Sequence, residues 1–228
     1  MDNRITEETG SISRSPAVEK VLLDLRERIM LGEISSEQQL AENALAAYYG
    51  VSRGSIRRAL QTLESEGLVI TSENGRRAPV VIDEKFTSDL YQIRLMIEAK
   101  AIQICLIKED IDTSIIATAF ADFYKLYSFQ GEELYFARSV VNTRFHRAVV
   151  ETAENQSLLQ CWNTLEPLIH GLAKFNYIKL KERQTNDDLI TSHQKLMDLI
   201  FRRDKAALTE IADHVGVAIN ETDWGLTI

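Results

Sequence analysis

Cysteine and proline are scarce in this sequence of 228 residues, which contains two cysteines and three prolines. Cys105 and Cys161 both lie in apolar surroundings, and two cysteines cannot form a disulfide framework or a cysteine-rich zinc site. This usage favours a reducing, cytoplasmic compartment. Because prolines are few and most glycines precede residue 76, we expect long uninterrupted helices in the rest of the chain.

Long apolar runs and an excess of positive charge are also absent. Apolar runs such as Val80–Ile82 are far shorter than the roughly 20 residues of a membrane-spanning helix. The first fifteen residues are polar and lack the apolar stretch of a secretory signal. The net charge of −8 argues against a protein coated in basic charge for non-specific nucleic-acid binding, but it allows a small basic site. We expect no membrane partner.

The patterning of the chain changes near residue 83. It predicts a flexible leader over residues 1–15, a first domain over 16–82 and a second over 83–228. The first domain is predicted to contain helices over 17–31, 42–49 and 53–66, then a hairpin of 68–71 with 79–82. The second is predicted to contain helices over 86–108, 115–129, 132–152, 156–180, 187–201 and 205–220. The fold class is thus mainly α, with an N-terminal winged helix-turn-helix that carries a small β-hairpin and a C-terminal all-helical bundle.

The helix predicted over 53–66 has one apolar face and one cationic face. Gly50 stands where the preceding helix needs a left-handed residue, and Ser52 offers a side-chain oxygen that caps the next helix. Arg53, Arg57 and Arg58 fall outside the apolar stripe. A short helix, a turn and a second helix that begins with arginines match the helix-turn-helix arrangement, whose second helix enters the major groove of DNA. On its own, a cationic helix face is more often a solvated surface.

The wider pattern separates these two interpretations. The string LAAYYGVSRGSIRRALQTLESEGLVIT resembles the winged helix of GntR-type bacterial transcription regulators, where LA…GVSR…R.AL..L…GL recurs. The resemblance implies a homodimer on palindromic, double-stranded operator DNA. By position, it implies DNA contacts from Ser52, Arg53, Ser55, Arg57, Arg58, Asn74, Gly75 and Arg76. The sequence departs from the family in two places: Asn43 stands where the family often has arginine, and Ser36-Glu37 stands where it often has Pro-Gly. Arg58 also replaces the usual acidic residue, which adds a positive charge on the same helix.

All four histidines lie in the predicted helical domain. Asn142 and His146 are four residues apart and therefore share one helix face, while His193 and His214 lie beside the apolar stripes of two other helices. Three histidines from three helices could converge inside a bundle and bind a divalent metal through neutral imidazole. A single histidine beside an apolar face is more often a core or surface residue, so spacing alone leaves both interpretations open.

A second resemblance bears on these histidines. The segments SDLYQIRLMIEAKAIQICL and NTRFHRAVVETAENQSL resemble the opening helix and the D..FH…N..L motif of the FCD ligand-binding domain in the FadR subgroup of GntR regulators. The resemblance implies a metal bound by one aspartate and three histidines, which correspond here to Asn142, His146, His193 and His214. Asn142 replaces the aspartate and removes a negative ligand. Zinc is expected ahead of nickel or manganese because nitrogen ligands suit it.

The same resemblance implies a small carboxylate effector beside the metal. Arg94 and Arg138 are the candidates for pairing with its carboxylate, although salt bridges with Glu98 or Glu133 explain them equally well. We expect a metabolite-responsive transcriptional regulator, a repressor that the effector releases from its operator. Two alternatives stay open: a metal-free regulator that binds long acyl chains, and a tri-histidine metalloenzyme, for which the sequence has no HExxH motif.

Overall fold

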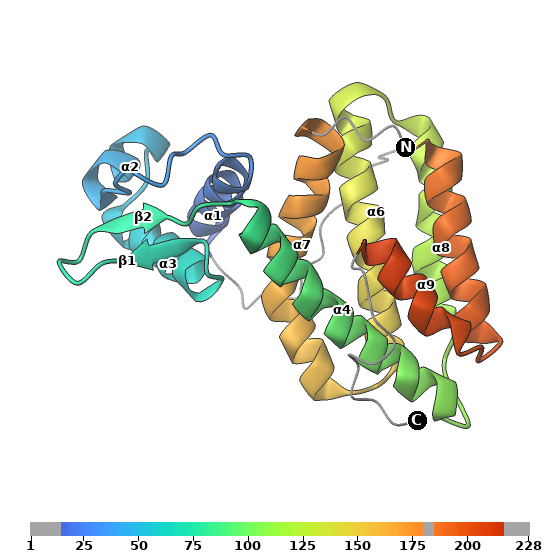
Figure 1. Cartoon of the computed structure of the whole chain (residues 1–228). Helices are drawn as coiled ribbons and strands as arrows, with labels where there is room; N and C mark the ends of the chain where they lie inside the picture. Colours follow the sequence, from blue (N-terminus) through green and yellow to red (C-terminus); the bar gives the residue numbers. More distant parts are fainter. Residues whose placement is uncertain (1–14, 180–184, 217–228) are drawn as a thin grey trace. The chain divides into compact units, whose positions relative to one another are not determined.

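The computed structural model describes residues 15–179 and 185–216. Within these ranges the chain forms nine α-helices, one 3-10 helix and one antiparallel pair of strands (Figure 1). The chain divides into two compact units, with the division between Thr87 and Ser88. Most of the predicted leader lies outside the described residues. The predicted fold class, a winged helix-turn-helix followed by a helical domain, is confirmed.

The first unit contains α1 Pro16–Met30, α2 Glu42–Tyr49, α3 Arg53–Ser65, β1 Val69–Thr71 and β2 Arg77–Pro79. The apolar stripe of α3 is its buried face, since Ile56 and Leu60 have no exposed surface. Gly50 ends α2 with a φ of 64°, in the left-handed region that favours glycine. Ser52 caps α3 by accepting a hydrogen bond of 3.1 Å from the Ser55 N–H. The turn between α2 and α3 therefore forms as the sequence predicts.

The hairpin differs from the prediction in the position of its second strand. The strand predicted over 79–82 begins at Arg77, which lies opposite Thr71. The turn sets this register, because the Ser72 N–H donates a hydrogen bond of 2.9 Å to the Arg76 carbonyl and closes a short loop. The apolar run that suggested the later strand continues past the end of the pairing. Register here depends on turn geometry more than on apolar pattern.

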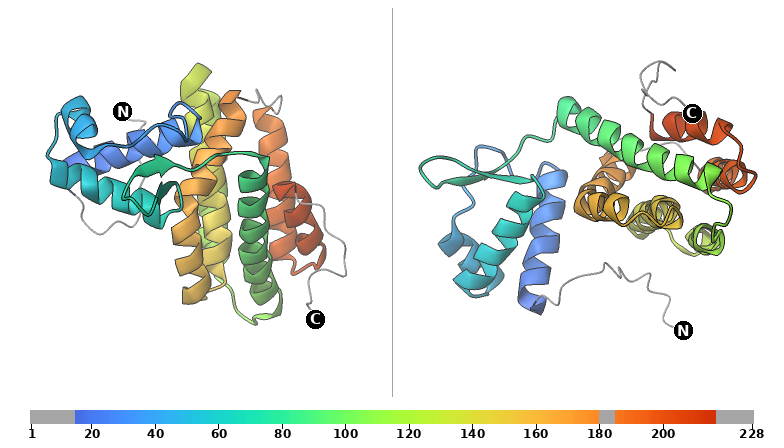
Figure 2. Two further views of the ribbon diagram at one scale, coloured as in Figure 1. Left: turned by 60° about the vertical axis from the view of Figure 1, so that its left-hand side comes forward. Right: turned by 90° about the horizontal axis from the view of Figure 1, so that it is seen from below.

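The second unit, called the helical unit below, has no strand among its described residues. It contains α4 Glu84–Ile107, which starts just before the division, α5 Ser114–Ala121, the 3-10 helix η1 Asp122–Ser128, α6 Gly131–Thr152, α7 Gln156–Lys179, α8 Asn186–Phe201 and α9 Ala206–Val215. Helices α6 and α7 run side by side in the views of Figure 1 and Figure 2. No helix among the described residues is both long and apolar enough to cross a membrane.

The helix predicted over 115–129 is divided into α5 and η1. Side chains three residues apart eclipse one another in a 3-10 helix, so Phe123 and Leu126 point in the same direction. Both side chains are fully buried. An α-helix would also place these two residues on one face, but the tighter winding aligns them more closely towards the core.

Helix α6 forms the centre of the helical unit and is buried on most of its surface. Apolar residues such as Val141, Phe145 and Val149 have no exposed surface. A helix that is buried nearly all round normally carries apolar side chains alone. Helix α6 also buries polar ones, namely Arg138, Ser139, Asn142, Thr143, His146 and Thr152. Buried polar groups need partners, so this concentration marks the candidate site.

Candidate metal centre and nucleic-acid interface

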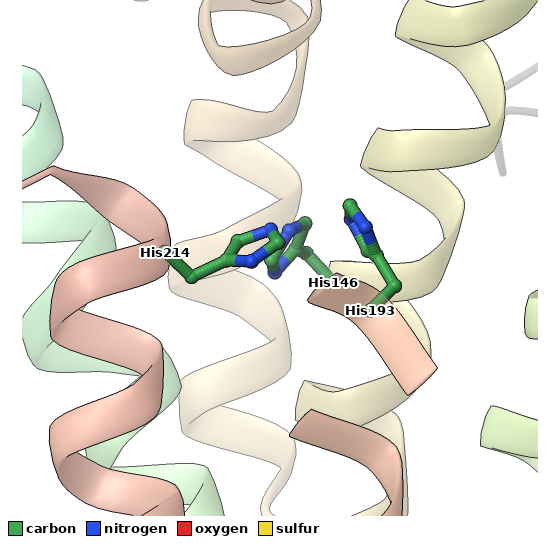
Figure 3. Close-up of side chains that lie close together, drawn as sticks. All are labelled: His146, His193 and His214. Carbon is green, nitrogen blue, oxygen red and sulfur yellow. The ribbon is translucent and has the colours of Figure 1, made fainter. Parts of the chain in front are cut away.

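Three histidines from three helices converge in the helical unit. His146 on α6, His193 on α8 and His214 on α9 place one ring nitrogen each within 4.8 Å of the others. Figure 3 shows the three rings gathered between the helices that carry them. His146 and His193 are fully buried, and His214 is partly exposed. We call these three residues the histidine cluster. The sequence suggested that they could converge, and the structure brings them together.

Oxygen atoms lie beside the Nδ1 atoms of the two buried rings, and at His146 this contact assigns the proton. The Nδ1 atom of His146 lies 2.5 Å from the Glu98 carboxylate, and that of His193 lies 2.7 Å from the Leu189 carbonyl. The Glu98 oxygen accepts, so the neutral ring of His146 donates from Nδ1 and keeps its lone pair on Nε2. The ring of His193 has an oxygen beside each nitrogen, since Asn142 Oδ1 lies near its Nε2, and its one proton can go to either. The Nε2 atom of His146 is buried and has no hydrogen-bond partner among the described residues. An unpartnered buried lone pair directed into a histidine cluster fits a metal ligand.

Asn142 lies beside the cluster, as its place in the predicted motif requires. Its Oδ1 atom is 2.9 Å from Nε2 of His193. An amide oxygen would be an uncharged metal ligand, and neutral imidazoles are uncharged as well. The four side chains together therefore bring no negative charge to the site. Negative charge comes from Glu98, which is fully buried and contacts the cluster through His146. A carboxylate behind a ligating imidazole raises the basicity of that ligand, so the donor set fits a divalent metal that accepts nitrogen ligands.

The histidine rings are neutral at neutral pH. Burial lowers the pKa of His146 and of His193 well below the ordinary value, and the Arg94 charge lowers both further. Burial, followed by the neighbouring His146 and Arg94, lowers the pKa of His214 to about 3. Burial raises the pKa of Glu98, and Arg94 opposes that shift. Neutral imidazole is the form that binds metals, so no proton has to leave these rings before a metal binds.

Arg94 and Arg138, the two predicted effector-binding residues, are both buried. The Arg94 Nε donates to Glu98 at 2.7 Å, and its Nη2 is buried with no hydrogen-bond partner among the described residues. Arg138 donates from Nε and Nη2 to the side-chain oxygen of Asn186, at 2.9 and 2.7 Å. Arg94 therefore forms the ion pair with Glu98 that the sequence left open and still has a free donor, while Arg138 bonds Asn186 and not the other expected partner, Glu133.

The cationic face of α3 lies in the first unit. The side chains of Arg53 and Arg57 are 63% and 53% exposed, and Arg58 is exposed as well. Ser52 is exposed at the start of α3, whereas Ser55 is 6% exposed and its hydroxyl lies 3.0 Å from that of Ser52. The arginines thus offer the larger contact surface, and the two serines mainly build the start of the helix.

The predicted wing residues form the turn of the hairpin. Asn74 shapes that turn, because its side-chain oxygen accepts hydrogen bonds from the Ser72 hydroxyl and the Arg76 N–H. Gly75 has a φ of 77° and is exposed. The Arg76 guanidinium donates to the Glu37 carbonyl at 2.5 Å. All three predicted wing residues are therefore on the surface of the hairpin.

Sequence reasoning did not identify Glu42, which contacts arginines of both α3 and β2. Its carboxylate bonds Arg57 at 2.8 and 3.0 Å and Arg77 at 3.1 Å. The hydrogen bonds and charge of Arg57 hold the pKa of this carboxyl below its ordinary value. These partners are 15 and 35 residues away along the chain, so no local pattern reveals the contact.

Comparison with known proteins agrees with both halves of this description. Residues 17–78 match the family of bacterial regulatory proteins of the gntR type, and residues 89–216 match the FCD domain. The chain is a GntR-family transcriptional regulator with an FCD domain. Among curated relatives, the gluconate operon transcriptional repressor of Bacillus subtilis is 24% identical over 205 residues, which cover 87% of this chain and 82% of the relative. That of Bacillus licheniformis is 26% identical over 200 residues, covering 85% and 79%.

Solved structures show that the fold also occurs in other proteins. Lar, which controls the expression of the Listeria monocytogenes agr system, has a TM-score of 0.65 at 20% identity and covers 90% of this chain and 95% of its own. McbR/YncC of E. coli has a TM-score of 0.62 at 17% identity, covering 89% and 95%. The family consists of transcriptional regulators, so the metalloenzyme alternative is excluded.

Proposed function

We propose that this GntR regulator is a repressor that binds a palindromic operator as a homodimer and is released by a small carboxylate. The effector binds in the helical unit beside a divalent metal. The observation that carries the proposal is the convergence of the histidine cluster, Asn142 and the free donor of Arg94 within that one unit. The protein works in the cytoplasm, where its operator is accessible.

The metal is held by His146, His193 and His214, with the Asn142 oxygen as a fourth donor. Zinc is the first candidate because nitrogen ligands suit it, ahead of nickel and manganese. A bound divalent metal supplies positive charge that attracts a carboxylate. The Arg94 guanidinium donates a second, charge-assisted hydrogen bond from Nη2. Arg138 is bonded to Asn186. Its contact with the effector carboxylate would replace those hydrogen bonds, so it would form only when the effector is bound.

The likeness to the two gluconate operon repressors supports the effector class and the mode of regulation. Gluconate is itself a small carboxylate. On the DNA side, the exposed residues of α3 and the wing, chiefly Arg53, Arg57, Arg58 and Arg76, supply the contacts with bases and phosphates. Effector binding changes operator affinity because it stabilises one arrangement of the dimer over another.

The test begins with protein that was purified without a histidine tag or chelator and loaded with zinc. Operator sequences are selected from random duplexes, and binding is measured by fluorescence anisotropy with a panel of small carboxylates. We expect at least one carboxylate to weaken operator binding about tenfold, a coupling of about 1.4 kcal/mol. The matched amide of that compound is expected to have no effect.

Three results would contradict the proposal. If the selection enriched no DNA sequence, the proposed recognition of an operator would be wrong. Release by long acyl compounds in metal-free protein favours the acyl-responsive alternative. A monomer by light scattering on operator DNA excludes the dimer.

A further inference from the structure

One carboxylate in the first unit contacts arginines of the helix α3 and of the wing strand β2. Glu42 lies at the start of α2, and its side chain is 20% exposed. Its Oε1 accepts from Arg57 Nε at 3.0 Å and from Arg77 Nη1 at 3.1 Å. Its Oε2 accepts from Arg57 Nη2 at 2.8 Å and lies 3.9 Å from Nη2 of Arg53. Helix α2, the recognition helix α3 and the wing strand β2 thus share one anionic group.

The geometry of the Arg57 contact leaves part of the guanidinium free. Glu42 bonds the edge formed by Nε and Nη2, so two of the five N–H groups of Arg57 are engaged. The remaining three lie on Nη1 and on the far side of Nη2. A guanine offers two acceptors, N7 and O6, to two parallel N–H groups. Arg57 can therefore bond Glu42 along one edge and a guanine along the other at the same time.

A carboxylate at this place has opposite effects on two kinds of DNA contact. It repels phosphates and offsets part of the positive charge of the three arginines, which weakens sequence-independent attraction. It also holds a long, flexible side chain in one orientation, which reduces the ordering that a base contact requires. An arginine that serves only as a phosphate contact gains nothing from a carboxylate held against it.

We propose that Glu42 is a positioning residue that directs Arg57 to a guanine of the operator and lowers affinity for other DNA. This inference rests on the proposed operator binding. It makes Glu42 a determinant of specificity although it touches no base. The opposite role, a competitor that DNA must displace from Arg57, predicts tighter operator binding when the carboxylate is removed.

The test compares Glu42→Gln with Glu37→Gln. Glu37 is exposed in the loop before α2. The two variants carry equal charge because each loses one carboxylate. Binding to the selected operator and to a scrambled duplex is measured by anisotropy over a range of salt concentrations. We expect Glu42→Gln to bind the scrambled duplex more tightly and the operator about tenfold more weakly, on the scale of one bidentate base contact. Glu37→Gln is expected to keep the specificity ratio of the unaltered protein.

A modified operator separates positioning from general damage to the fold. Replacing the contacted guanine with 7-deazaguanine removes its N7 acceptor. Each operator guanine is replaced in turn, and at one of them we expect the unaltered protein to lose about tenfold in affinity and Glu42→Gln to lose about twofold. Glu42→Asp, which keeps the charge, is expected to restore part of the ratio, and matching thermal melts confirm that the variants fold.

Several outcomes overturn the inference. An unchanged specificity ratio in Glu42→Gln, or an equal loss on 7-deazaguanine DNA in both proteins, removes the positioning role. Tighter operator binding by Glu42→Gln assigns the competitor role. If the unaltered protein itself shows no preference for any operator, the proposed function fails, and this result is distinct from a failure of the Glu42 assignment.

Discussion

The carboxylate of Glu98 on α4 lies 2.5 Å from Nδ1 of His146 on α6, and both side chains are fully buried. This contact orients the imidazole so that Nε2 is directed into the histidine cluster. It also brings a buried carboxylate into direct contact with one ring of the cluster. The orientation of His146 within the histidine cluster therefore depends on a residue outside that cluster.

Replacing this carboxylate tests that dependence. We expect Glu98→Gln to weaken zinc binding about 10- to 100-fold, because the amide supplies less negative charge to His146. Competition with a chromogenic chelator measures the change. Glu133→Gln, at an exposed position on α6, removes the same charge elsewhere and is expected to bind zinc normally. Equal zinc affinity in both variants would show that Glu98 acts only in the Arg94 ion pair.

Asn142 gives a prediction of opposite sign for metal-free and metal-bound protein. Asn142→Asp places a carboxylate in the cluster, so we expect metal-free protein to melt at a lower temperature and zinc to bind more tightly. For the unaltered protein, zinc at 100 times its Kd should add about 2.7 kcal/mol to the free energy of unfolding. Differential scanning fluorimetry across a zinc titration measures both effects. If zinc raised the melting temperature of Asn142→Asp no more than that of the unaltered protein, Asn142 would not be a metal ligand.

Arg57 on α3 is expected to be essential for specific DNA binding. Arg57→Ala should abolish preference for the operator and leave the melting temperature nearly unchanged, because the side chain is 53% exposed. A gel-shift assay on the selected operator measures the loss. Arg202→Ala, at an exposed position in the helical unit, serves as the charge-matched control. Unchanged operator affinity in Arg57→Ala would refute the recognition-helix assignment.

Arg58 has a different predicted role from Arg57. If it contacts phosphate, Arg58→Ala lowers affinity for all duplexes alike and reduces the slope of log affinity against log salt by about 0.9. The slope is measured for operator and scrambled DNA in parallel. Loss of affinity for the operator alone would instead indicate a base contact.

The two cysteines should differ in reactivity. Burial raises the pKa of the Cys105 thiol to about 11, whereas Cys161 is exposed. At pH 8 we expect one thiol per native chain to react rapidly with a disulfide reagent, and two after denaturation. Since the folded-state pKa of Cys105 exceeds its ordinary value of 9.0, this group's contribution to stability is complete below pH 9 and is lost as the pH rises towards 11. Cys105→Ala should reduce that alkaline loss in a denaturation series.

The sequence predicts those features that depend on neighbours in the chain. The apolar stripe of α3, the cap at Ser52 and the left-handed Gly50 follow from local spacing, and the structure contains all three. Family motifs extend this reach to the histidine cluster, whose members are distant in sequence. The start of β2 and the division of 115–129 into α5 and η1 depend on turn closure and core packing, which the apolar pattern does not encode.

The partners of the site residues were the least predictable part. Glu98 was one of two candidate partners for the arginines, but its contact with His146 joins residues 48 positions apart. The contacts of Glu42 with Arg57 and Arg77 likewise depend on how α2, α3 and the hairpin pack. Such groups adjust the chemistry of the residues that the motifs identify.

One member of the histidine cluster lies on the short helix α9. This helix has ten residues, too few for a stable isolated helix in water, so it is held by the packing of its buried face. His214 lies in its last turn. A metal bound by His214, His146 and His193 would link α9 to α6 and α8. The last turn of α9 could then unfold only if the bond between the metal and His214 broke. Amide hydrogen exchange along α9 should therefore slow when metal binds, which makes this helix an internal reporter of site occupancy.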